Sequence, residues 1–121
     1  MTTVKLTLLV LRCRDLELSR RFYAALGLAF TTEQHGTGPV HYSCRLGTTV
    51  VELYQAASST SSVRLGLAVG DLATAVEAVR SVGARVDHEP TAERATCIVR
   101  DPDDNRVELS LNADKGRPTS C

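Results

Sequence analysis

Apolar residues follow the same order twice along this chain. An apolar run from Val4 to Leu11 precedes Asp15 and a stretch with apolar residues at helical spacing, and the same order returns 56 residues later around Asp71. Runs of this length predict strands, and an aspartate ahead of an apolar stripe is typical of a helix N-cap. The repeat therefore predicts a duplicated module, and equivalent positions of the two copies are expected to meet at a cleft between them.

Each copy is predicted to contain one helix and four strands. The first helix ends at Gly27 and the second at Gly83. The apolar face of the first helix consists of Leu18, Phe22, Ala25 and Leu26. Segments of strand character follow the helices at residues 28–32, 40–46 and 49–55 in the first copy and at 84–86, 95–100 and 106–111 in the second. The predicted module is therefore strand, helix and three further strands, or βαβββ.

The length of 121 residues suits one compact domain built from two such modules. We expect a single domain over residues 1–111, with the first module at 4–55, a linker rich in Ala, Ser and Thr at 56–62 and the second module at 63–111. The polar tail at 112–121 is expected to be disordered. The predicted fold class is α+β.

Charge and composition exclude several kinds of partner. The 14 basic and 14 acidic residues cancel and there is no Trp, so neither the basic surface nor the aromatic platform of a nucleic-acid-binding protein is expected. No apolar run is long enough for a signal peptide or a membrane span, which predicts a cytoplasmic protein without membrane contact. Cys13, Cys44 and Cys97 lie in apolar runs without the spacing of a zinc site and are predicted to be buried.

Two motifs indicate a family. Residues 14–23 read RDLELSRRFY and precede Leu-Gly-Leu at 26–28, and residues 100–109 read RDPDDNRVEL. Together with the 56-residue repeat, these motifs resemble the glyoxalase, bleomycin-resistance and extradiol-dioxygenase family, also called the vicinal oxygen chelate superfamily. The resemblance implies a curved eight-stranded mixed sheet, a half-barrel, around a cleft with the helices outside, and a homodimer. Asp104 stands where the closing turn of this family usually has Gly.

The metal site of that family is not intact in this sequence. Family enzymes hold a divalent ion with one residue from the first strand and one from the last strand of each module, commonly His or Glu. The matching first-strand positions are Leu8 and Arg64, and the last-strand positions are Glu52 and Glu108. Leu8 has no donor atom and the permanent charge of Arg64 repels a cation, so no standard metal site and no cofactor is expected. Arg64 is expected to pair with one or both glutamates instead.

His41 is the residue that could restore a metal site. A two-residue hairpin turn at 47–48 makes Ser43 oppose Glu52 and His41 oppose Tyr54, which directs all four side chains to one face of the sheet. A single histidine in a strand is more often an ordinary packed residue than a ligand. If a divalent Zn, Ni, Fe or Mn ion is present, its expected ligands are Glu52, Glu108 and His41.

The other two histidines lie in predicted loops. His35 belongs to a flexible loop at 33–39 that could overhang the mouth of the cleft, and His88 occupies a comparable loop of the second copy. Neither histidine has a partner that the sequence identifies, and solvent exposure is the ordinary expectation for such loops.

Two functions fit these residues best. The first is binding of a small polar molecule in the cleft, similar to the drug-sequestering branch of the family, with Glu52 and Glu108 accepting hydrogen bonds or a positive group, Arg64 anchoring an anionic group, and His41 and Tyr54 adding polar contacts. The alternative is a lyase or isomerase similar to glyoxalase, in which Glu52 or Glu108 removes a proton next to a carbonyl and a divalent metal or Arg64 stabilises the enediolate. A third possibility is a scaffold whose cleft is filled by an ion network of Glu52, Arg64 and Glu108.

Overall fold

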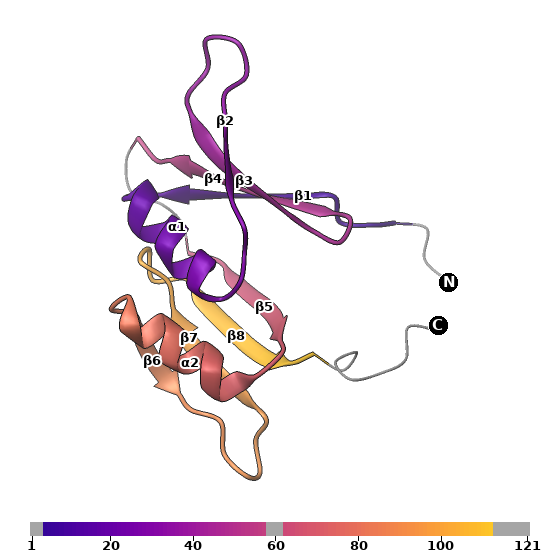
Figure 1. Ribbon diagram of the computed structural model, residues 1–121, viewed down its shortest axis with the longest axis vertical. Coiled ribbons are helices and arrows are strands. Elements are labelled where there is room, and N and C mark those ends of the chain that lie inside the picture. Colours follow the sequence, from indigo (N-terminus) through magenta and orange to yellow (C-terminus); the bar gives the residue numbers. More distant parts are fainter. Residues whose placement is uncertain (1–3, 58–61, 113–121) are drawn as a thin grey trace.

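The chain forms two successive βαβββ modules, and its computed structural model describes residues 4–57 and 62–112 (Figure 1). The first module consists of β1 (Leu8–Cys13), α1 (Leu16–Ala25), β2 (Thr31–Glu33), β3 (His41–Leu46) and β4 (Thr49–Gln55). The second consists of β5 (Arg64–Val69), α2 (Leu72–Ser81), β6 (Arg85–His88), β7 (Thr96–Arg100) and β8 (Arg106–Leu111). The α+β class and the doubled module are confirmed.

The eight strands form two mixed sheets of the same topology. The strand order is β1-β4-β3-β2 in the first sheet and β5-β8-β7-β6 in the second. In each sheet the opening strand of the module pairs in parallel with its closing strand, and the remaining pairs are antiparallel. The eight strands expected for the half-barrel are present, and within one chain they are divided between two four-stranded sheets, one for each module (Figure 1).

Both helices begin and end as the sequence predicts. The side chains of Asp15 and Asp71 each accept a hydrogen bond from the backbone N–H three residues further on, at 3.1 and 2.9 Å. These N-caps satisfy a donor that the first turn of a helix leaves free. Gly27 and Gly83 follow the helices with φ of 111° and 88°, a left-handed conformation that glycine adopts without a steric penalty.

Each helix packs on one face of its own sheet and leaves the other face uncovered by helices. Helix α1 contacts β4, α2 contacts β6, β7 and β8, and the two helices contact each other where the modules meet (Figure 1). Strand residues that face the helices form the core, among them the fully buried Leu53 and Leu109. Because side chains alternate along a strand, Glu52 in β4 and Glu108 in β8 lie on the helix-free faces of the two sheets.

The turn between β7 and β8 joins the second module to the first helix. Tyr23 donates a hydrogen bond from Oη to Asp101 Oδ2 at 2.6 Å, and Ser19 Oγ donates to Asp103 Oδ2 at 3.3 Å. The backbone N–H and Nε of Arg14 both donate to Asp103 Oδ1, at 2.9 and 3.0 Å. Buried polar groups are stable only with such partners, so this turn fixes how the two modules sit against each other.

The same contact changes which face of α1 is buried. Phe22 is buried as predicted, but the predicted stripe is wrong at Leu18, which is 42% exposed, whereas Ser19 and Tyr23 are buried. Hydrophobic periodicity considers apolar residues alone. It therefore misses two polar residues that are buried because aspartates of the other module accept their hydrogen bonds.

Three further predictions concern cysteines, termini and membranes. Cys13, Cys44 and Cys97 are buried, as predicted, and are free of disulfides, and burial raises the pKa of the Cys13 thiol to about 11. Residues 58–61 of the predicted linker and residues 113–121 of the predicted disordered tail lie outside the described residues. Each helix is ten residues long, and over the described ranges neither has the length and apolarity that crossing a membrane requires.

Candidate functional site

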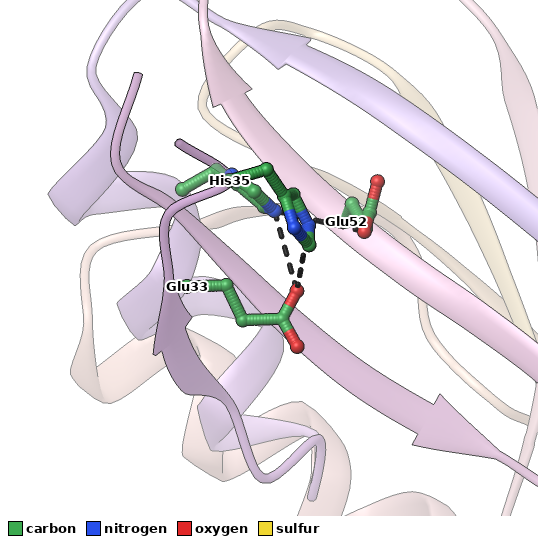
Figure 2. A group of neighbouring side chains, drawn as sticks. Glu33, His35 and Glu52 are labelled. Atoms are coloured by element: carbon green, nitrogen blue, oxygen red, sulfur yellow. Dashed lines mark ion pairs between the residues drawn. The ribbon is translucent and has the colours of Figure 1, made fainter. Parts of the chain in front are cut away.

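Two carboxylates and two imidazoles meet on the helix-free face of the first sheet (Figure 2). Glu33 ends β2, His35 lies in the following loop, His41 begins β3 and Glu52 lies in β4. Strand pairing positions three of these residues, because Glu33 pairs with His41 and Ser43 pairs with Glu52. His41 and Ser43 are two residues apart in β3 and share a face, so His41 lies diagonally opposite Glu52.

The donor atoms of these four side chains lie close together. His41 Nε2 is 3.3 Å from Glu33 Oε1 and 3.6 Å from Glu52 Oε2, and His35 Nε2 is 3.7 Å from Glu33 Oε1. One donor atom from each residue lies within 4.8 Å of those of the other three. Figure 2 shows the His35 side chain close to the carboxylates of Glu33 and Glu52. We call these four residues, Glu33, His35, His41 and Glu52, the His–Glu cluster.

His41 is the buried centre of the cluster, with 1% of its surface exposed. Its Nδ1 lies 3.3 Å from the Pro39 carbonyl oxygen, which can only accept a hydrogen bond, so Nδ1 is the donor. The ring of Tyr54 stacks on the imidazole with centroids 4.2 Å apart, and its hydroxyl lies 3.3 Å from Nε2. Arg12 lies over the Tyr54 ring at 5.3 Å from its centroid. These contacts fix the imidazole with Nε2 turned toward the two carboxylates.

The loop between β2 and β3 folds back and places His35 beside His41. The backbone N–H of Gly38 donates to the His35 carbonyl at 3.0 Å, and Gln34 Nε2 donates to the Gly38 carbonyl at 2.9 Å. Gly36 supplies the positive φ of 59° that this tight turn requires. The His35 ring is consequently 5.2 Å from the His41 ring, although the His35 side chain is 74% exposed.

A cavity of about 430 Å³ opens beside the cluster. Glu33, His35 and Glu52 line it together with polar Ser43 and Arg45. The remaining lining residues are Ala29, Thr31, Cys44 and Val50. Clefts that hold small ligands generally combine such a volume with a few converging polar groups.

The predicted residues of the second module lie elsewhere. Arg64 Nη2 pairs with Glu108 Oε1 at 3.7 Å, as one alternative of the predicted ion network requires. Both residues line a separate cavity of about 230 Å³ with residues of the second sheet and with Arg94 of the loop between β6 and β7; His88, predicted to lie in a loop, ends β6 and also lines this cavity. The two cavities share no lining residue, so a single chain brings Glu52 to His41 and Tyr54, and brings Glu108 to Arg64.

The hairpin argument from the sequence is confirmed by the structure. Gly47 and Thr48 form the two-residue turn, Ser43 pairs with Glu52, and His41 stacks on Tyr54. The sequence did not assign Glu33 or His35 to the site, because β2 was predicted to end at residue 32 and the register between β2 and β3 was not predicted. The available signal was the spacing Glu-x-His at 33–35, directly before the strand that carries His41.

The donor set at the family's standard metal positions does not suit an ion. Leu8 is aliphatic and 50% exposed, and the guanidinium of Arg64 carries a fixed positive charge next to Glu108. Two of the four standard positions therefore offer no electron pair to a metal. Glu52 is the one standard position whose carboxylate lies beside histidine donors.

Two tandem βαβββ modules, each with one helix on a mixed four-stranded sheet, define the architecture of the vicinal oxygen chelate superfamily. The family described as glyoxalase-like domain matches residues 8–110, which is most of the chain. The protein belongs to this glyoxalase-like family.

Solved structures of similar proteins agree with this assignment. A hypothetical protein from S. aureus is 22% identical, with a TM-score of 0.71 over 93% of this chain and 100% of its own. An antibiotic-binding protein from Streptomyces, TnmS3, is 19% identical, with a TM-score of 0.70 over 93% and 99%. The trypanothione-dependent glyoxalase I of Leishmania major is 20% identical, with a TM-score of 0.69 over 90% and 87%. At these identities the likeness establishes the fold alone, and no curated protein sequence matches significantly.

Proposed function

We propose that the protein binds a small polar molecule with a positively charged group in the cavity of its first sheet. The observation that supports this most directly is the 430 Å³ cavity, which carries the carboxylates of Glu33 and Glu52 on its wall. Hydrogen bonds from a cationic group to a carboxylate are shorter and stronger than those between neutral groups. Ser43 and Arg45 on the same wall can orient the polar remainder of the ligand.

His41 and Tyr54 act in this proposal by positioning the carboxylates. The buried His41 does not line the cavity, but its Nε2 lies within 3.6 Å of carboxylate oxygens of both Glu33 and Glu52. Tyr54 holds the imidazole by stacking on it. A site with pre-oriented charged groups loses less entropy when a ligand binds, so these two residues contribute to affinity without touching the ligand.

Arg64 and Glu108 are assigned to a cleft that two copies of the chain complete. We expect a homodimer in which the first sheet of one copy faces the second sheet of the other. The charges support this, because the first cavity carries two glutamates while the second carries Arg64, Arg94 and Arg106. Exposed apolar side chains at Val4, Leu6 and Leu8 also suit burial at an interface. Sedimentation equilibrium of the purified protein measures the subunit number directly.

Proton abstraction is the alternative, and the position of Glu52 favours it. Its carboxylate lines the cavity and is held 3.6 Å from an imidazole, which is how a general base is oriented in an enzyme site. In this case Glu52 would remove a proton next to a substrate carbonyl, as the resemblance to glyoxalase implies. Arg45, which lines the same cavity, would face the oxygen on which charge develops.

Calorimetric titration of matched ligands tests the proposal. Small amines, carboxylates and neutral polyols of similar size are titrated in the presence of a chelator, so that no metal contributes. We expect amines to bind, and Glu52→Gln to weaken that binding at least about tenfold, because it removes the charge while preserving the shape. Glu77→Gln, on the exposed face of α2, is the control. Binding of carboxylates in preference to amines, or equal amine affinity in wild type and Glu52→Gln, would refute the proposed binding of a cationic ligand. Turnover of an α-ketoaldehyde–thiol adduct that depends on Glu52 would favour the alternative function, proton abstraction.

A further inference from the structure

We propose that the His–Glu cluster is a binding site for a borderline divalent cation such as Zn²⁺, contained entirely in the first module. This site differs from the standard positions of the family, of which it uses Glu52 alone. Its other three ligands come from the end of β2, the loop after it and the start of β3. The inference goes beyond the proposed binding of an organic cation, and because both occupants use the carboxylates of Glu33 and Glu52, a bound metal ion excludes the organic cation.

The kinds of donor atom select the class of metal. Two imidazole nitrogens and two carboxylate oxygens suit Zn²⁺ and neighbouring divalent ions such as Ni²⁺ and Fe²⁺. Hard ions such as Ca²⁺ and Mg²⁺ prefer oxygen ligands alone. Two glutamates also balance the two positive charges of the ion, so the occupied site is electrically neutral.

The spacing of the donor atoms fits a four-coordinate ion. Zinc binds nitrogen and oxygen ligands at about 2.0–2.1 Å, and two ligands at a tetrahedral angle around one ion are then about 3.3–3.4 Å apart. The observed separations between His41 Nε2, Glu33 Oε1 and Glu52 Oε2 are 3.3 and 3.6 Å, and His35 Nε2 lies 3.7 Å from Glu33 Oε1. All separations among the four donor atoms lie within 4.8 Å, so an ion would draw the more distant pairs together by up to about 1.4 Å, which the exposed side chain of His35 allows.

The surroundings of His41 match those of a metal ligand. Its Nδ1 donates to the Pro39 carbonyl, which leaves Nε2 as the nitrogen that faces the carboxylates. Metal-binding histidines generally donate their second ring N–H to a carbonyl or carboxylate, and this contact fixes the ring. The ring of Tyr54 stacks on the imidazole of His41 at 12° from parallel, so the Tyr54 hydroxyl near Nε2 lies over the imidazole face. The lone pair of Nε2 lies in the plane of the imidazole instead.

The ion pairs of the described residues distinguish these carboxylates from several others. Asp87, Asp103 and Glu108 each pair with an arginine. Within the same described ranges, the ion pairs of Glu33 and Glu52 are with histidines alone. An arginine partner is always charged and has no lone pair for a metal ion, whereas a neutral histidine can bind the same metal ion as the carboxylates.

Metal titration of chelator-treated, tag-free protein tests this site. Zn²⁺ is measured by calorimetry and Co²⁺ by its visible absorption, which reports four-coordinate geometry, in a Cys121→Ser background that removes the tail thiol. We expect one ion per chain with a dissociation constant in the micromolar range or tighter, and no competition from Mg²⁺. Substitution of a residue that only supports a metal ligand typically costs 10–100-fold in affinity for the metal. His35 and Glu52 are proposed as direct ligands, so His35→Ala and Glu52→Gln should each weaken Zn²⁺ binding at least about tenfold.

Matched variants decide between a site and unspecific binding. Glu77→Gln removes a glutamate on the exposed face of α2, outside the cluster and outside both cavities, and should bind Zn²⁺ as the wild type does. His35 is largely exposed, so its substitution leaves the fold intact even if His41 variants do not fold. Equal affinity of His35→Ala and wild type, or no saturable Zn²⁺ binding by the wild type, would overturn the proposal. Amine binding is measured with chelator present, so it can succeed or fail independently.

Discussion

The contact between Tyr23 and Asp101 should hold the two modules together, and replacing Tyr23 with Phe tests it. The substitution removes one hydroxyl and keeps the ring, which packs edge-on against Phe22 with centroids 4.8 Å apart. The hydroxyl is buried and donates to a carboxylate at 2.6 Å. Burial, together with the neighbouring Asp101, raises the pKa of the Tyr23 phenol far above its ordinary value, so this donor keeps its proton at physiological pH.

The expected loss of stability follows from this geometry. A hydrogen bond to a charged group contributes about 1.5–3 kcal/mol, and Asp101 keeps its hydrogen bonds from Asn105 and from the Asp103 backbone. Unfolding entropy is about 2.1 cal/mol/K per residue, which for 121 residues gives a shift of about 4 °C for each kcal/mol. Tyr23→Phe should therefore lower the melting temperature by roughly 6–12 °C.

Urea unfolding followed by circular dichroism measures this loss, with Tyr42→Phe as a matched control. The Tyr42 hydroxyl donates to the exposed Glu17 at 3.1 Å, so its removal should cost less than about 0.5 kcal/mol. The slope against urea should be unchanged in both variants, because neither alters the surface exposed on unfolding. A loss below about 0.5 kcal/mol for Tyr23→Phe, or equal losses for the two variants, would refute the role assigned to this contact.

Two further substitutions test local contacts of the second module, one in the turn between β7 and β8 and one in β6. Asp104 adopts a φ of 66°, so Asp104→Gly should raise the free energy of unfolding by about 0.5–1 kcal/mol in urea titrations, and an unchanged or lower stability would show that the left-handed conformation carries no strain. Hydrogen bonds from Arg85 and then from Arg100 lower the pKa of Asp87 in the folded protein. The ionised carboxylate therefore stabilises the fold above the pKa of Asp87 in the unfolded chain, about 3.9, and this stabilisation is lost as pH falls below that value. Melting temperature should therefore fall less steeply below pH 4 in Asp87→Asn than in the wild type, and parallel profiles would contradict this.

The fold was predictable because local signals and the repeat agree with each other. Capping aspartates, left-handed glycines and a two-residue hairpin turn each specify one local geometry, and each occurs where the pattern requires it. The burial of Tyr23 was not predictable in this way. It depends on a partner 78 residues away in the other module, and hydrophobic periodicity carries no information about such a pair.

The candidate site was predictable only in part, for a similar reason. Alternation along β3 and β4 is a local rule, and it correctly placed His41 beside Glu52 and Tyr54. The addition of Glu33 and His35 depends on the register of β2 and on a folded-back loop, which one backbone hydrogen bond, one hydrogen bond from the Gln34 side chain and a left-handed glycine determine. A seven-residue connection has many possible conformations, so the sequence alone did not indicate that its histidine returns to the sheet.

Comparison of equivalent positions shows why the His–Glu cluster forms in the first module and has no counterpart among the described residues of the second. Glu108 pairs with Ile98 in the second sheet as Glu52 pairs with Ser43 in the first, so the residues equivalent to His41 and Tyr54 are Thr96 and Ser110. Hydroxyl groups there offer neither an imidazole nitrogen nor a ring that could hold one in place. The same backbone therefore carries four donor atoms in one half, whereas in the other half the glutamate already has an arginine partner. Duplication supplied two equivalent carboxylates, and the side chains around each decide whether it is available to a cation.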